Sequence, residues 1–73
     1  MTESIFNQII GNNIKAYRKE KGYKRQEDFA KAVGTSRSNI AHLESPNINQ
    51  GVSLYLLYKI AKILNKRIDD FFI

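Results

Sequence analysis

The stretch that decides the fold runs from Gln26 to Glu44 and reads QEDFAKAVGTSRSNIAHLE. It contains two short segments whose apolar residues recur every three to four positions, the period of one helix face. Gly34 separates them, and either Thr35 or Ser36 after it can cap a second helix. Two short helices joined by a tight glycine-containing turn form a helix-turn-helix unit. We therefore predict such a unit over about residues 26–45.

The apolar positions of this unit predict how its two helices pack. The inward residues are Phe29, Ala30 and Val33 in the first helix and Ile40 and Leu43 in the second. The small side chain of Ala30 lets the helices cross closely, and Gly34 permits the positive φ of a tight turn. Because Ile40 and Leu43 anchor the second helix, its opposite face is expected to point outward.

A longer helix is predicted before the unit. Its apolar face consists of Phe6, Ile10, Ile14 and Tyr17, at helical spacing. Thr2 can cap its start, and Gly22 can take the left-handed position at its end. Gly11 lies inside this pattern and weakens the prediction of an unbroken helix, since glycine is a poor helix former.

Two further helical segments follow the unit. The stretch from Ser45 to Gly51 has the composition of a loop. Ser53 then caps a helix that ends at Asn65, and its apolar positions are Leu54, Leu57, Ile60, Ala61 and Leu64. Residues 68–72 form a last short turn of helix. The sequence thus predicts an all-α fold, a compact five-helix bundle without strands, as a single domain over residues 1–73.

Composition excludes several classes of function. The 73 residues contain no cysteine and one histidine, His42, which leaves no plausible zinc site or thiol chemistry. We find no nucleophile–base pair and no phosphate-binding loop, so we predict neither an enzyme nor a cofactor. The first four residues carry an acid, Glu3, and no basic residue, and the sequence has no apolar run long enough to span a membrane. A cytoplasmic location is therefore the expectation.

The positive charge is concentrated in one part of the chain. Lysine and arginine number 12 against 7 acidic residues, a net charge of +5. Between Lys15 and Arg37 there are eight basic and three acidic residues, so this segment accounts for the whole excess. Such clustering favours a nucleic-acid partner over a role in solubility alone.

Three stretches resemble the lambda-repressor/Cro-type (XRE-like) helix-turn-helix family. Residues 14–22 (IKAYRKEKG) resemble its first helix, residues 26–44 its helix-turn-helix, and residues 53–72 its last two helices. The sequence departs from the family pattern in a longer turn before Gln26, in Pro46 where glycine is common, and in Arg67 where Ser or Thr often caps a helix. The resemblance implies a transcriptional regulator, similar to Cro or a restriction-modification controller protein, that reads the major groove of double-stranded DNA.

The resemblance also implies roles for individual residues. Base contacts are expected from Arg37, Ser38 and His42. Phosphate contacts are expected from Gln26, Ser36, Asn39, Ser45, Lys24 and Arg25. Arg18 and Glu44 match a buried ion pair that ties the first helix to the end of the reading helix. For Gln26, Arg37, His42 and each lysine, an ordinary solvated side chain remains the alternative.

The helix from Ser53 to Leu64 carries more apolar residues than one buried face requires. Leu56 and Ile63 lie seven residues apart on a second stripe. We predict a homodimer on a near-palindromic operator, with an interface that consists of Leu56, Ile63, Phe71, Phe72 and Ile73. The alternative is that Phe71 closes the core and the others are scattered exposed residues. A second function also stays open, an antitoxin or protein-interaction module that binds a protein partner through this surface.

Overall fold

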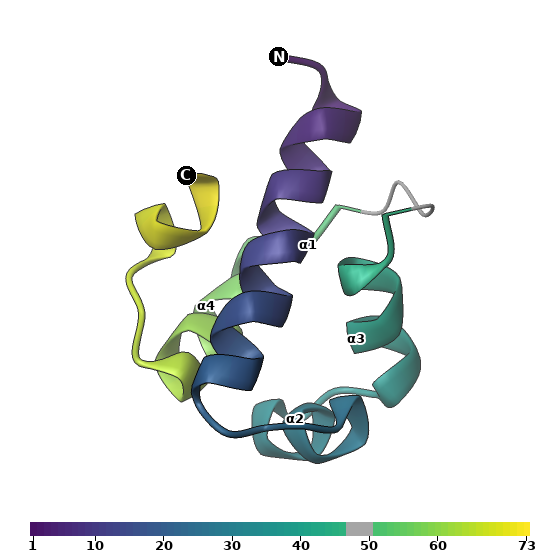
Figure 1. Ribbon diagram of the computed structural model, residues 1–73, viewed down its shortest axis with the longest axis vertical. Coiled ribbons are helices and arrows are strands. Elements are labelled where there is room, and N and C mark those ends of the chain that lie inside the picture. Colours follow the sequence, from purple (N-terminus) through teal and green to yellow (C-terminus); the bar gives the residue numbers. More distant parts are fainter. Residues whose placement is uncertain (47–50) are drawn as a thin grey trace.

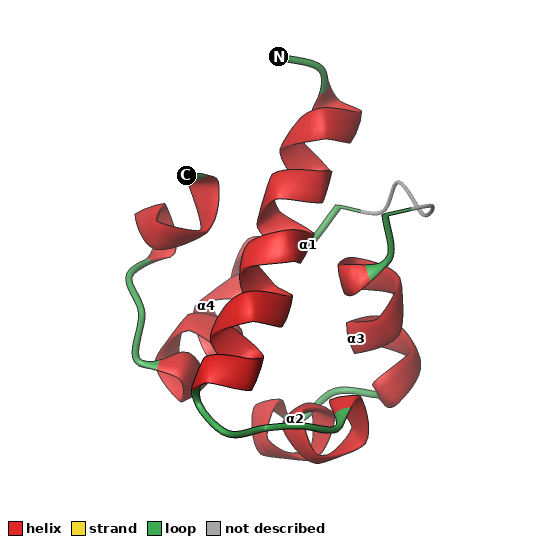
Figure 2. Ribbon diagram, in the orientation of Figure 1, coloured by secondary structure: helices red, strands yellow, loops and turns green. Residues whose placement is uncertain are grey.

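Four α-helices and one 3₁₀ helix make up the part of the chain that the computed structural model describes, residues 1–46 and 51–73 (Figures 1 and 2). They are α1 (Glu3–Glu20), α2 (Gln26–Val33), α3 (Arg37–Glu44), α4 (Leu54–Leu64) and the 3₁₀ helix η1 (Ile68–Phe72). No strand occurs within these two ranges, in agreement with the all-α prediction. Residues 47–50 of the predicted loop lie outside the described residues.

The predicted fifth helix is a 3₁₀ helix, so the five-helix prediction needs correction on this point. With only five residues, η1 is too short to build a regular ladder of α-helical hydrogen bonds. Its first turn is closed by a hydrogen bond that spans three residues, in which the Asp70 N–H donates to the Arg67 carbonyl oxygen at 3.1 Å. The Asp70 carboxylate in turn accepts from the Arg67 N–H at 2.9 Å. This bond caps η1 at the position where the family often has Ser or Thr.

The helices begin and end at the residues that the sequence predicted. Three of the helices, α1, α3 and α4, are capped at their starts by a hydroxyl group. The side chains of Thr2, Ser36 and Ser53 each accept a hydrogen bond of 3.1 Å from the backbone N–H three residues later. Of the two candidates Thr35 and Ser36, the cap is therefore Ser36. Left-handed residues follow α1, α2 and α4, namely Gly22, Gly34 and Asn65. These caps fix the turn between α2 and α3 at only three residues.

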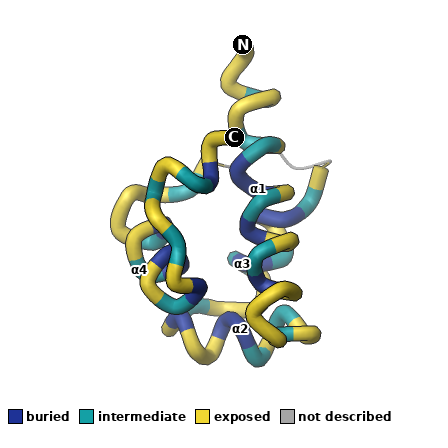
Figure 3. Tube along the Cα trace, turned by 60° about the vertical axis from the view of Figure 1, so that its left-hand side comes forward, coloured by how far each residue is buried: buried dark blue, intermediate teal, exposed yellow. Residues whose placement is uncertain are grey.

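One hydrophobic core joins all five elements (Figure 3). Every inward position predicted for the helix-turn-helix unit is buried, and Ile14, Phe29, Ile40, Ile60 and Phe71 are the largest of the fully buried side chains. Leu54 was predicted to face the core and is instead 74% exposed. The prediction is wrong because Leu54 is the first residue of α4, and Ser53 and Tyr55 on either side of it are exposed as well.

Gly11 lies inside α1, which is unbroken. A Cβ atom at this position would collide with the carbonyl oxygen of Leu43 near the end of α3. Glycine therefore allows the backbones of α1 and α3 to approach each other closely, which offsets its low helix propensity. This close approach holds α3 against the middle of α1.

No helix in the described ranges is long and apolar enough to cross a membrane. In those same ranges, no group of three or more His, Cys, Asp or Glu side chains could hold a metal ion.

Candidate nucleic-acid interface

The outward face of α3 is polar and exposed. Arg37, Ser38 and His42 are all exposed, whereas Ile40 and Leu43 on the other side of the helix are buried. Ser38 and His42 are four residues apart, so they lie on the same face, and Arg37 is the first residue of the helix. The structure thus brings the three predicted base-contacting residues together on one short helix.

Ser36 and Asn39 build the turn that presents this helix. The Ser36 hydroxyl accepts from the Asn39 backbone N–H at 3.1 Å, and Asn39 Nδ2 donates to Thr35 Oγ1 at 2.9 Å. Both residues were predicted to contact phosphates. Each keeps a donor for that purpose, because the hydroxyl proton of Ser36 and the second amide proton of Asn39 are not used in these bonds.

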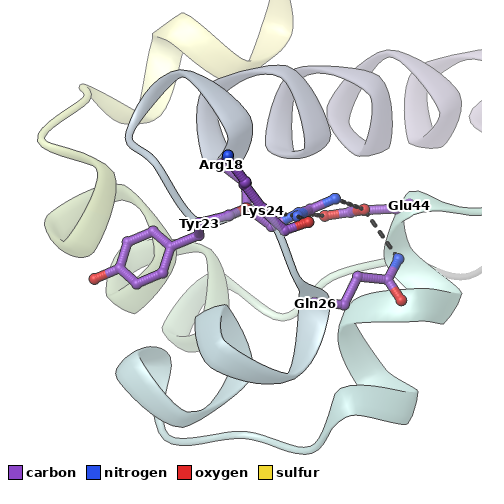
Figure 4. Close-up of polar contacts among 5 residues, drawn as sticks. All are labelled: Arg18, Tyr23, Lys24, Gln26 and Glu44. Carbon is purple, nitrogen blue, oxygen red and sulfur yellow. Dashed lines mark hydrogen bonds and ion pairs between the residues drawn. The ribbon is translucent and has the colours of Figure 1, made fainter.

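Arg18 and Glu44 form a buried ion pair between α1 and the end of α3, as predicted (Figure 4). Arg18 Nε lies 2.8 Å from Glu44 Oε2, and the side chains are 3% and 2% exposed. A second bond joins Arg18 Nη2 to Glu44 Oε1 at 3.1 Å, which makes the pair bidentate. Arg18 Nη1 also donates to the carbonyl oxygens of Tyr23 and Lys24, at 2.7 and 3.0 Å. One guanidinium therefore holds α1, the turn before α2, and α3 together.

Gln26 joins the same network, which the sequence did not predict. Its Nε2 donates to Glu44 Oε1 at 3.1 Å (Figure 4). Gln26 is the first residue of α2 and is partly buried, so its amide is held at the helix start where an anion is favoured. The second proton on Nε2 remains a donor for a phosphate.

Arg25 is ion-paired at the start of α2. Its Nε lies 2.9 Å from Asp28 Oδ2, and its Nη1 lies 3.2 Å from Glu27 Oε1. The hydrogen bond from Arg25 lowers the pKa of the Asp28 carboxyl below its ordinary value, and the same bond raises the pKa of Arg25. A phosphate would have to share this guanidinium with the two carboxylates. Lys24 next to it is exposed.

The predicted interface residues fall into three groups. Phe71 is fully buried, with its ring edge-to-face against Tyr17 at a centroid distance of 5.3 Å, so its assignment to an interface is wrong. It belongs to the core because η1 packs against α1. Leu56 and Ile63 are partly buried against the core. Phe72 and Ile73 are exposed.

Comparisons with known proteins place this arrangement in a family. A helix-turn-helix family model matches residues 14–71. An HTH-type transcriptional regulator of Archaeoglobus fulgidus is 50% identical over 48 residues, which are 66% of this chain and 66% of that protein. The HTH-type transcriptional regulator SinR of Bacillus subtilis is 37% identical over 57 residues, 78% of this chain and 50% of SinR.

Another Bacillus subtilis protein, the HTH-type transcriptional regulator YazB, is 40% identical over 63 residues, which are 86% of this chain and 87% of YazB. The matched region spans just under two thirds of the Archaeoglobus protein and half of SinR. The family match and the YazB alignment both include all of α2, the turn and α3. The chain therefore belongs to the XRE-type helix-turn-helix family.

Proposed function

We propose that this protein is a sequence-specific DNA-binding transcriptional regulator that reads the major groove with the outward face of α3. The observation that carries the proposal is the exposed set Arg37, Ser38 and His42 on a helix whose other face is fixed in the core. A guanidinium can donate two hydrogen bonds to guanine O6 and N7, so Arg37 is the main candidate for base recognition. The relatives named as HTH-type transcriptional regulators support this function.

Phosphate contacts then fix the register of α3 in the groove. We assign them to the residues around the starts of α2 and α3 and the end of α3: Gln26, Ser36, Asn39, Ser45, Lys24 and Arg25. Gln26 is the strongest of these candidates, since Glu44 holds its amide at the N-terminus of α2. The basic excess between Lys15 and Arg37 adds a diffuse attraction to the DNA backbone.

We further propose that the protein acts as a two-fold dimer on a near-palindromic operator. Such a dimer places two reading helices in successive major grooves, about 34 Å apart. Exposed apolar residues at the end of η1, Phe72 and Ile73, are available for the contact.

Binding should weaken steeply with salt. Each phosphate neutralised releases counterions, so the logarithm of the affinity should fall with the logarithm of the salt concentration, with a slope of about −0.9 per phosphate contact. An operator can be obtained by selecting genomic fragments on the protein, followed by footprinting, and titrated at several salt concentrations. Absence of binding to selected fragments even at low salt would rule out the proposed function.

Arg37→Ala should reduce affinity for the operator by about 1–3 kcal/mol and relax the preference at one base pair. Gln26→Ala should instead weaken binding to all sequences alike, because phosphate contacts carry no sequence information. Lys62→Ala on α4 is the matched control, since it removes the same charge from an exposed site outside the helix-turn-helix unit. If Arg37→Ala kept the same preferred sequence and the same margin over random DNA, α3 would not read bases through Arg37.

A further inference from the structure

Exposed apolar side chains gather where the start of α1 lies beside the end of η1. The first turns of α1 project beyond the other helices, and the end of η1 lies at the same end of the molecule (Figures 1 and 3). Ile5 and Phe6 are 49% and 37% exposed, and Phe72 and Ile73 are 39% and 85% exposed. The rings of Phe6 and Phe72 are in contact, with centroids 5.4 Å apart. Ile5 and Ile73 are exposed chain neighbours of this pair. The four residues are here called the end patch.

All four residues of the end patch lie outside the stretch that the family model matches, residues 14–71. Ile5 and Phe6 precede this stretch, and Phe72 and Ile73 follow it. Ile5 also stands three residues after the N-cap Thr2, where Glu or Gln would complete a capping box. A half-exposed isoleucine there does not help the helix start. Its exposed side chain is instead available for a contact with another molecule.

Side chains of α1 hold the end of η1, and with it Phe72 and Ile73 of the end patch, in place. Asn13 Nδ2 donates to the carbonyl oxygen of Phe71 at 2.9 Å and to the main-chain oxygen of Ile73 at 2.8 Å. The Tyr17 hydroxyl donates to the carbonyl oxygen of Asp70 at 2.8 Å. Three hydrogen bonds thus fix the end of η1 against α1. A surface that is ordered before binding loses less conformational entropy when it binds.

The charge distribution indicates what covers the end patch. Residues 1–14 and 68–73 contain no lysine or arginine, although the whole chain has a net charge of +5. Two copies of a basic protein repel each other least where positive charge is absent, and DNA is attracted elsewhere. The acids near the end patch are partly compensated, since Asp69 Oδ1 lies 3.2 Å from Arg67 Nε and Asp70 caps η1. Glu3 lies in the first turn of α1, where the helix dipole favours negative charge.

We propose that the end patch binds the end patch of a second copy in a two-fold dimer, with the first turns of α1 supplying half of each side. In such a dimer the same residues face each other across the two-fold axis, so the patch of each copy covers the patch of the other. The inference rests on the dimer in the proposed function. It places the contact on α1 and η1, whereas Leu56 and Ile63 already pack against the core of their own chain.

Ile5→Glu tests this placement. The substitution puts a negative charge on each side of the proposed contact and should raise the dimer dissociation constant about 100-fold or more. The monomer should stay folded, because Glu at this position can complete a capping box with Thr2. Sedimentation equilibrium of the free protein at micromolar concentrations measures the dimer, and circular dichroism checks the helix content. Ile73→Glu provides a second variant, at a position outside the regular helices.

Leu54→Glu is the matched control. Leu54 is exposed at the start of α4, and its substitution should leave the dimer intact. A monomeric wild type, a dimer unchanged by both Ile5→Glu and Ile73→Glu, or equal disruption by Leu54→Glu would overturn the proposal. Binding of a single half-site by the Ile5→Glu monomer at low salt separates the proposed dimer contact from the proposed DNA-binding function. If the wild type dimerises through the end patch but binds no DNA, the proposed function fails and the dimer stands.

Discussion

Replacing Glu44 by alanine should lower the free energy of unfolding by about 3–5 kcal/mol. The substitution removes the carboxylate that accepts two hydrogen bonds from Arg18 and one from Gln26. Arg18 would then keep a charge in a site where its side chain is 3% exposed, with only two carbonyl oxygens as partners. Because small domains are stable by only about 5–15 kcal/mol, the variant should be close to unfolding at room temperature.

Urea unfolding followed by circular dichroism measures this effect. Glu27→Ala is the control, since Glu27 pairs with Arg25 on the surface and its loss should change the stability little. A Glu44→Ala protein as stable as the wild type would mean that the buried pair does not hold α3 to α1. The same variant should also lose DNA affinity, because Glu44 positions the Gln26 amide.

Local chemistry made most of the fold predictable from the sequence. Cap residues such as Ser36 and Ser53 act on the backbone three positions away, and Gly34 and Asn65 meet the demand for positive φ within a single residue. These features depend on neighbours in the chain. The inward residues of α2 and α3 were predictable for a similar reason, since the helix period places them on one face.

Several features that depend on contacts between distant segments were not predictable, and the Arg18–Glu44 pair was predicted only through the family resemblance. Gly11 is required because α3 crosses α1 there, and nothing near Gly11 in the sequence indicates the carbonyl oxygen of Leu43. Phe71 and Phe72 are adjacent in a short 3₁₀ helix, so periodicity could not decide which of them is buried. The ring of Tyr17, more than fifty residues away in the chain, packs against Phe71. This contact makes Phe71 the buried residue of the two.

The candidate interface shows the same division. The exposed face of α3 followed from its two buried anchors, Ile40 and Leu43. The bond from Gln26 to Glu44 did not follow, since it joins the start of α2 to the end of α3. Nor did the pairing of Arg25 with Glu27 and Asp28, because the choice among rotamers of long side chains is not visible in the sequence. The bond from Gln26 ties a predicted phosphate contact to the buried pair of Arg18 and Glu44 that supports the reading helix.

Gly11→Ala should lower the stability of the protein even though alanine is the better helix former. In an exposed helix the substitution would add up to about 1 kcal/mol of stability. Here the new methyl group meets the carbonyl oxygen of Leu43, a backbone atom that can yield only if α3 moves away from α1. Overpacking of this kind typically costs about 1–3 kcal/mol beyond any gain in propensity.

Thermal unfolding measures the balance, since 1 kcal/mol corresponds to about 4–8 °C in the melting temperature of a domain this small. Asn12→Ala is the matched control, because Asn12 is the exposed neighbour of Gly11 on the same helix and its replacement should be neutral or slightly stabilising. A Gly11→Ala protein that melts higher than the wild type would show that α1 and α3 are not in close contact at Leu43. The expected loss should extend to DNA binding, because Leu43 is followed directly by Glu44, and a shift of α3 there disturbs the bonds to Arg18 and Gln26.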